Sequence, residues 1–423
     1  MLFAPLNLSN EDGMERRGLV ESTAVFLIAG AWLFYLATWT GFRVGKPVYT
    51  RDNLVFDMDV PTVAQTLLHE ADPQFKSRHR LGRPIWGPVG AALKSLSSPL
   101  VGPENARSVA ARLLMAFWGG IGFASLWHLA RGRGLPLSVR LLLFASYAVF
   151  TSQILCSVPE FYGISAGILS LSFAIYCSRL NLLWKAAILS TLTIIGSGTT
   201  TTVGAVPAAC LALSIIFAYL PPETARKWVL SAIVAGTCLV VIGVGILAIG
   251  PYRNSIRDTI DGKGVGIGTH YRLLRNPEIV PGFVLRGLIH PAVGTHPEIF
   301  DGPTKRPTFN NSIWNQADKL ALAGQVAWVV LLVWGTIASL GSGFQNFESL
   351  LLIGWIAGNL ALHNIWGNEF FLYSPHWSWA LFSLVILGAG RIPAVVLWSA
   401  GIVMIAGGIS EILTIEELLR SLS

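Results

Sequence analysis

The apolar stretch "LVESTAVFLIAGAWLFYLATWTG", residues 19–41, is followed along the chain by further runs of the same kind. Each run approaches about 20 residues, the length of helix that crosses the hydrocarbon core of a membrane. The runs lack the alternation of apolar and polar residues that marks the strands of a membrane barrel. Only helices and closed barrels satisfy their backbone groups in lipid. The sequence therefore predicts an all-α, polytopic helical membrane protein.

The composition agrees with this class of protein. Only 13% of the 423 residues are charged, compared with about 25% in soluble proteins, and the mean hydropathy is +0.58. The net charge of +7 comes from scattered basic residues. This scatter favours membrane lipids or a phosphate-bearing ligand as partners, and it argues against nucleic acid.

Eleven transmembrane helices are expected from the apolar runs. They cover residues 19–41, 107–130, 136–156, 158–178, 183–198, 202–220, 227–250, 321–341, 347–365, 374–390 and 392–411. No internal repeat or separate soluble domain is visible, so residues 1–423 are predicted to form a single integral membrane domain.

The short loop "ARGRGLPLSVR", residues 130–140, sets the expected orientation. It contains Arg131, Arg133 and Arg140 and no acid, which marks a cytoplasmic loop. Alternation then places residues 42–106 and 251–320 outside. The first segment is expected to carry juxtamembrane or re-entrant helices, notably at 84–100, and the second to form an extracytoplasmic cap or lid.

With this orientation, four polar motifs fall on the outer face. They are "FDMDVP" at 56–61, "CSVPEFYG" at 156–163, "GSGTTTTVG" at 196–204 and "LHNIWGNEFFLYSPHW" at 362–377. Random polar decoration would be scattered over both faces. The shared face therefore predicts an active or binding site at the outer membrane interface.

Two clusters in the first outer segment carry distinctive chemistry. Asp57 and Asp59 lie two residues apart and face the same side of an extended segment, so they are compatible with a divalent cation or a general base. Their alternative role is an ordinary solvated acidic pair. Arg78, His79, Arg80 and Arg83 follow. Arginine forks match phosphate oxygens, although they also anchor proteins to anionic lipid.

The other three motifs offer groups for a ligand pocket, each with a simpler alternative. Glu160 and Tyr162 either line the cavity or place an acid at a helix start. Thr200 either contacts a sugar or belongs to a turn whose small residues let helices pack closely. Glu369, Tyr373 and His376 combine an acid, an aromatic ring and an imidazole suited to sugar binding. Tryptophans nearby are typical interfacial anchors.

Taken in order, these motifs resemble the GT-C class of integral membrane glycosyltransferases. The stretch "NLVFDMDVPTV", residues 53–63, is similar to an N-x-x-F-x-x-D-x-P-x-V element of a bacterial GT-C-like group. His79 stands in "SRHRLGRPIW", where that group has an H-P-L-F element. "PEFYG", "GTTTT" and "WGNEFFLYSPHW" resemble its Pro-Glu-x-Tyr, Gly-x-Thr-x-Thr and Trp-Gly-x-Glu-x-Phe-Leu-Tyr-Ser elements.

The resemblance implies a function and distributes roles among the candidates. The donor would be a polyprenyl-phosphate sugar, transferred at the outer face of a bacterial inner membrane to a lipid, glycan or protein. Asp59 would be the general base, supported by Asp57, and the arginines would hold the departing phosphate. The resemblance names no certain cofactor, and whether a metal binds is left open.

Three other classes remain as alternatives on the sequence alone. They are a transporter or flippase of a lipid-linked sugar, an O-antigen polymerase or ligase, and a non-catalytic scaffold. A transporter is expected to keep ionisable groups near the bilayer midplane and to show repeats. The early acidic motif fits polymerases and ligases less well.

Overall fold

The structure is a computed structural model of the chain. It describes residues 8–43, 63, 66–68, 82–200, 202–220, 224, 280–294, 297–300, 306–309, 318–341, 347–365 and 373–421. The predicted span at 227–250 and much of the two long outer segments lie outside these ranges.

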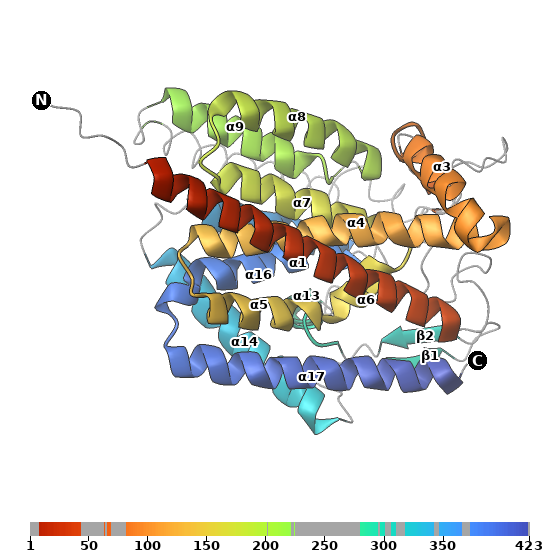
Figure 1. The fold of residues 1–423 in the computed structure, drawn as a ribbon. Coiled ribbons are helices and arrows are strands. Elements are labelled where there is room, and N and C mark those ends of the chain that lie inside the picture. The colour runs from red at the N-terminus through yellow and green to blue at the C-terminus, as the bar shows by residue number, and fades with distance from the viewer. Residues whose placement is uncertain are drawn as a thin grey trace, which may run out of the picture.

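Helices account for nearly all of the described chain (Figure 1). They are α1 (Leu8–Arg43), α3 (Gly82–Val101), α4 (Pro103–Gly132), α5 (Leu137–Ala148), α6 (Thr151–Ser157), α7 (Phe161–Cys177), α8 (Leu182–Thr199), α9 (Ala205–Tyr219), α13 (Val280–Ile289), α14 (Lys319–Leu340), α15 (Phe347–Ile365), α16 (Pro375–Gly388), η5 (Ala389–Arg391) and α17 (Ala394–Ser421). One antiparallel hairpin joins β1 (Pro297–Phe300) to β2 (Arg306–Phe309), with Pro297 opposite Phe309.

Five described helical segments are long and apolar enough to cross a membrane. They are residues 18–40 of α1 and the whole of α4, α8, α14 and α17. The bent pair α5 and α6 counts as a sixth if it forms one span, and α7, α9 and residues 347–363 of α15 are shorter apolar helices. The predicted helical membrane architecture is confirmed at this level, and the count of eleven spans stays a prediction.

The predicted span at 136–156 is wrong in one respect, because it is not a single helix. It forms α5 and α6, which meet at an angle of 67°. At the break, the amides of Thr151 and Ser152 donate to the carbonyls of Ala292 and Pro291, at 3.0 and 3.1 Å. A turn at residues 290–294 therefore supplies the acceptors that a continuous helix would have supplied itself.

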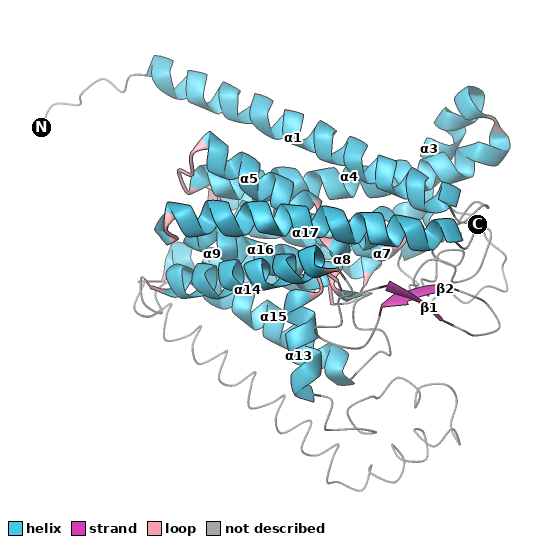
Figure 2. Cartoon of the chain, turned by 90° about the horizontal axis from the view of Figure 1, so that it is seen from below, coloured by secondary structure: helices cyan, strands magenta, loops and turns pink. Residues whose placement is uncertain are grey.

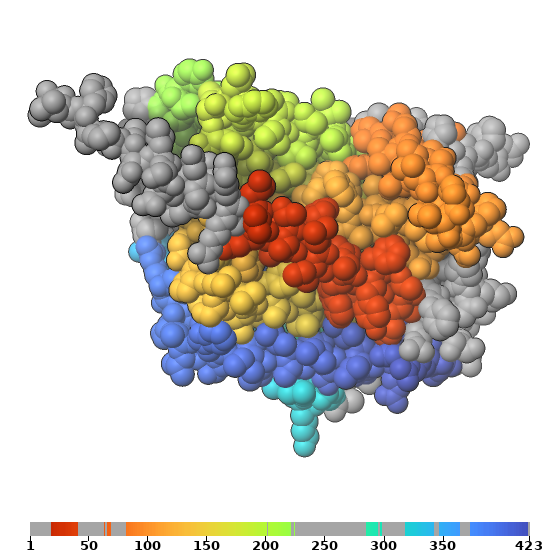
Figure 3. All heavy atoms as spheres, viewed as in Figure 1, coloured from red at the N-terminus to blue at the C-terminus, as the bar shows by residue number. Residues whose placement is uncertain are grey.

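The core lies where α4, α7, α14 and α16 meet. Helix α4 packs against α1, α3 and α7, and α14 packs against α16 and α17. Every residue of α16 except Leu387 is buried, which is typical of a helix surrounded by protein. By contrast, α1 exposes a row of large apolar residues including Leu27, Ile28 and Tyr35 and lies on the surface in Figure 3.

Glycines set the spacing of α14 from its neighbours. A Cβ added to Gly407 of α17 would lie 2.7 Å from the Cα of Gly324, and one added to Gly335 would lie 2.8 Å from the Cα of Val385. Real side chains do not approach backbone this closely. Small residues at such crossings let apolar helices pack by direct backbone contact.

The two ends of the bundle differ in charge. One of them, called here the basic end, collects Arg131, Arg133, Arg140, Lys185 and Arg391. Arg133 pairs with Glu348, which joins the end of α4 to the start of α15. Arg140 pairs with Glu21 at 2.5 Å, joining α5 to α1. The loop that the sequence marks as cytoplasmic thus lies with other basic residues at one end.

The other end carries α3 and the β1–β2 hairpin near the finish of α17, as Figures 1 and 2 show. There Asp318 caps α14 by accepting a 2.8 Å hydrogen bond from the amide of Leu320. The hydroxyl of Ser410 in α17 donates to the same carboxyl group. These two hydrogen bonds lower the pKa of Asp318, the Ser410 contact having the larger effect.

Gly407→Ala is expected to destabilise the protein by about 1–3 kcal/mol, the usual cost of overpacking a close contact. Gly354→Ala in α15 is the matched control, because no atom of the described residues lies within 4 Å of its added Cβ. Thermal unfolding of the purified protein in detergent compares the two. Equal melting temperatures would contradict the assigned role of the α14–α17 contact.

Asp318 is expected to make stability depend on pH. Because its pKa in the folded protein lies below the ordinary 3.8, its stabilisation is present above pH 3.8 and is lost as the pH falls toward the lowered pKa. The melting temperature of Asp318→Asn should therefore lie below that of the unsubstituted protein at pH 6. The gap should narrow toward pH 3, and a gap that does not change with pH would contradict this role.

Candidate functional site

The structure describes half of the predicted site residues. Arg83, Glu160, Tyr162, Thr200, Tyr373 and His376 lie within the described ranges. Asp57, Asp59, Arg78, His79, Arg80 and Glu369 lie outside them. The described part of the site consists of the ends of five helices, α3, α7, α8, α15 and α16. The acidic motif itself lies outside the described residues.

Glu160 occupies the position just before α7. Glu160 is buried, with 6% of its surface exposed. Its Oε2 accepts a 2.6 Å hydrogen bond from the amide of Phe161. An acid at a helix N-terminus also interacts favourably with the helix dipole. The helix-start role predicted as the alternative for Glu160 is confirmed, and this role holds the carboxylate at the same end of α7 as Tyr162.

An aromatic cluster forms beside Glu160 from the start of α7, the end of α15 and the start of α16. Tyr162 meets Tyr373 edge to face at 5.9 Å between ring centroids, and meets His376 at 5.5 Å. His363 stacks on Tyr373 at 4.2 Å and lies 6.3 Å from His376. The structure therefore brings Tyr162, Tyr373 and His376 together, as the sequence predicts.

The start of α16 is held by tryptophans, which bond the backbone carbonyl of His376. The indole N–H groups of Trp355 and Trp379 both donate to the His376 carbonyl, at 2.7 and 2.8 Å. The adjacent Trp377 is fully buried and donates at 2.7 Å to the carbonyl of Gly287 in α13. Trp377 and Trp379, expected to act as interfacial anchors, here serve as hydrogen-bond donors inside the protein, and Trp366 lies outside the described residues.

The start of α3 reaches the same place. A Cβ added to Gly82 would lie 2.8 Å from the ring of Phe161 and 3.1 Å from the carbonyl of Gly198. Arg83, next in sequence and half-buried, is thereby positioned near the start of α7 and the end of α8. The described parts of three predicted outer motifs, together with the start of α3, thus lie at one end of the bundle.

The segment that follows the acidic motif is buried in the core beside α3. Val63, four residues after Asp59, is 2% exposed, and Leu67 is fully buried. The carbonyl of Leu67 lies so close to Gly90 of α3 that an added Cβ would stand 1.9 Å from it. Helix α3 therefore contacts both the segment that follows the acidic motif and the start of α7.

The turn "GSGTTTTVG" is confirmed as a place of close packing. A Cβ on Gly204 would stand 2.1 Å from the hydroxyl of Ser197, and one on Gly196 would stand 3.2 Å from the amide of Gly204. Thr200 follows α8 and its hydroxyl lies 3.3 Å from that of Thr202. The sugar contact predicted for Thr200 stays a prediction.

A buried turn at residues 290–294 is the feature that sequence reasoning missed. The Gln325 side chain donates to the carbonyls of Val293 and Gly294, at 3.3 and 2.9 Å. The Thr151 hydroxyl accepts from the amide of Gly294 at 2.8 Å. This turn follows α13, so the same contacts hold Gly287 against Trp377. Gln325 stands alone in an apolar run, and a lone polar residue in such a run indicates a buried hydrogen-bond partner. This is the sequence signal that could have predicted the turn.

The described residues offer acid, imidazole and phenol groups, but no metal centre. Within the described ranges, no three His, Cys, Asp or Glu side chains are grouped closely enough to hold a metal ion. The described groups suit hydrogen bonding and aromatic stacking to a polar ring such as a sugar.

No family model matches the chain, and no curated protein is significantly similar to it.

Gln325→Leu is expected to lower the free energy of unfolding by about 1–3 kcal/mol, because it leaves two buried carbonyls without their donor. It should also raise hydrogen exchange at residues 287–294. Val326→Ala, at an exposed neighbouring position, is the control for both measurements. Unchanged exchange in Gln325→Leu would show that the turn is held by other contacts.

Proposed function

We propose that this protein is an integral membrane glycosyltransferase of the GT-C type. It transfers a sugar from a polyprenyl-phosphate donor to a lipid, glycan or protein acceptor. The observation that carries the proposal is the meeting of Tyr162, Tyr373 and His376, from motifs about 200 residues apart in sequence. The basic end contains the loop at 130–140 that marks the cytoplasmic side. The aromatic cluster lies at the opposite end of the bundle.

The proposal includes the topology that the site requires. The chain crosses the membrane eleven times, with the basic end in the cytoplasm and the aromatic cluster at the outer face of a bacterial inner membrane. The rule that positive loops stay inside supports this orientation. A lipid-linked donor reaches such a site through the bilayer, so no soluble nucleotide-binding domain is needed.

The reaction is a single displacement at the anomeric carbon. Asp59 removes the proton from the acceptor hydroxyl, whose oxygen forms the new bond to that carbon. The bond between the carbon and the phosphate oxygen breaks, and polyprenyl phosphate leaves with the bonding electrons. Asp57 supports the base, and Arg78, His79, Arg80 and Arg83 hold the phosphate charge. A divalent cation between the acids is compatible with this scheme but is not required by it.

The remaining residues shape the sugar and acceptor pocket. Tyr162 and Tyr373 offer aromatic faces and hydroxyl groups, and His376 and Glu160 offer polar atoms beside them. Glu369 and Thr200 are assigned to the same pocket from their motifs. Hydrogen bonds from such groups select a sugar, because the wrong hydroxyl pattern leaves buried polar atoms unpaired.

A transporter of lipid-linked sugars is the second candidate, and one observation favours it. The break between α5 and α6 is filled by the turn at 290–294, and broken helices often form the binding sites of transporters. A transporter would move the lipid-linked sugar without consuming it, so the fate of the donor distinguishes the two candidates.

Asp59→Asn is expected to lower sugar transfer by about 10²–10⁴-fold, the usual contribution of a general base. His376→Gln should lower transfer by a smaller factor. His128→Gln, an exposed histidine outside the cluster, should keep full activity. The assay supplies a panel of polyprenyl-phosphate sugars to the full protein in liposomes, and mass spectrometry of the envelope of a deletion strain names the acceptor.

Two results would contradict the proposal. Full transfer by Asp59→Asn would remove the assigned base. Donor that crosses the liposome membrane intact, with no polyprenyl phosphate released, would identify a transporter instead.

A further inference from the structure

A hollow of about 300 Å³ lies at the basic end, remote from the aromatic cluster. It is formed where α4, α14 and α16 finish. The lining residues are Arg133, Leu135, Ser339, Ile386, Leu387, Gly390 and Arg391. Two guanidinium groups from separate parts of the chain thus share one cavity, whose accessible lining is mainly polar.

Among the described residues, each of these two arginines makes one polar contact. Nη1 of Arg391 donates to the carbonyl of Ala338 at 2.8 Å, which caps the end of α14. Nη2 of Arg133 pairs with Glu348. A guanidinium carries five N–H donors in a rigid fork, so one tethering contact leaves donors available to an acceptor in the hollow.

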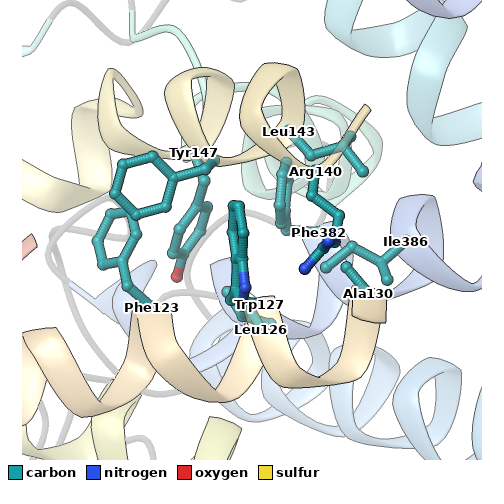
Figure 4. Close-up of a pocket in the computed structure, with 10 residues that line it drawn as sticks. Phe123, Leu126, Trp127, Ala130, Arg140, Leu143, Tyr147, Phe382 and Ile386 are labelled. Carbon is teal, nitrogen blue, oxygen red and sulfur yellow. The ribbon is translucent and has the colours of Figure 1, made fainter. Parts of the chain in front are cut away.

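The wall of the hollow continues into an aromatic region with a third cation. Ile386 lines both the hollow and a neighbouring pocket that contains Trp127, Tyr147 and Phe382 (Figure 4). In that pocket the Arg140 guanidinium lies 4.8 Å from the ring of Trp127. These rings are buried and Arg140 pairs with Glu21, so this region forms the packed protein wall behind the hollow.

We propose that this hollow binds the phosphate group of an anionic membrane lipid, with Arg133 and Arg391 as the phosphate ligands. The hollow lies at the ends of the candidate spans α4 and α14, which is the depth of the lipid headgroups. Bidentate pairing matches arginine to phosphate oxygens. Leu135 and Ile386 are buried and Leu387 is half-buried, so only the phosphate would enter the hollow, and the lipid chains would stay outside it in the bilayer. Lipid recognition here is separate from the proposed transfer reaction.

Glu348 makes the proposal testable in two directions. Its carboxylate competes with the ligand for Arg133, so Glu348→Gln should release that guanidinium and tighten phosphate binding. Arg391→Gln removes a phosphate ligand and should weaken binding. A purely structural role for these residues would predict loss of stability in both variants and no opposite shifts in affinity.

The experiment titrates the full protein in uncharged detergent with phosphatidylglycerol and counts bound lipids by native mass spectrometry. Arg391→Gln is expected to weaken binding by at least about tenfold, the effect of losing a charged hydrogen bond. Glu348→Gln should tighten it roughly two- to fivefold, the scale of an exposed ion pair. Arg420→Gln, which removes an arginine paired with Glu416 on α17, is the control and should leave binding unchanged.

Phosphatidylcholine and inorganic phosphate are titrated in the same way as comparison ligands. Weak binding of both supports recognition of an anionic lipid. Equal binding of phosphatidylcholine, or equal affinities of Arg391→Gln and Arg420→Gln, would overturn the proposal. Inorganic phosphate binding as tightly as phosphatidylglycerol would overturn its assignment to a lipid.

Discussion

The hydrogen bonds between the turn at 290–294 and the core are the constraint on which the described structure depends. Buried carbonyl and amide groups must find partners when water is absent. The carbonyls of this turn accept from Thr151, Ser152 and Gln325, and α5 and α6 part to admit it. This turn also fixes the position of α13, in which the Gly287 carbonyl accepts a hydrogen bond from Trp377. One set of polar contacts thereby connects a long loop, a broken helix and the aromatic cluster.

Charge separates the bundle into two chemically different ends. Ion pairs and capped carbonyls hold the helix ends together at the basic end, where Arg133, Arg140 and Arg391 combine structural contacts with spare donor capacity. The other end contains tyrosine, histidine and tryptophan packed around His376. Charged groups are costly within a bilayer, which is why the two polar regions stand at opposite ends of the apolar helices.

Much of the fold was predictable from local sequence. The predicted spans at 107–130, 183–198 and 321–341 fall on α4, α8 and α14, because a long apolar run needs no distant partner to form a helix in lipid. The break within 136–156 was not predictable in this way. Its residues are apolar and suited to a helix, and the competing hydrogen-bond acceptors come from a turn about 140 residues later.

The sequence by itself determined the helical membrane class, the positions of α4, α8 and α14, and three of the polar motifs at one end of the bundle, since these follow from composition and order along the chain. Only the tertiary structure decided that Glu160 caps α7, that His363 stacks on Tyr373, and that Arg133 and Arg391 share a hollow. Ring contacts and shared cavities depend on which faces of distant helices are turned toward each other. Glycine contacts such as Gly324 with Gly407 set that rotation, and no local pattern specifies them.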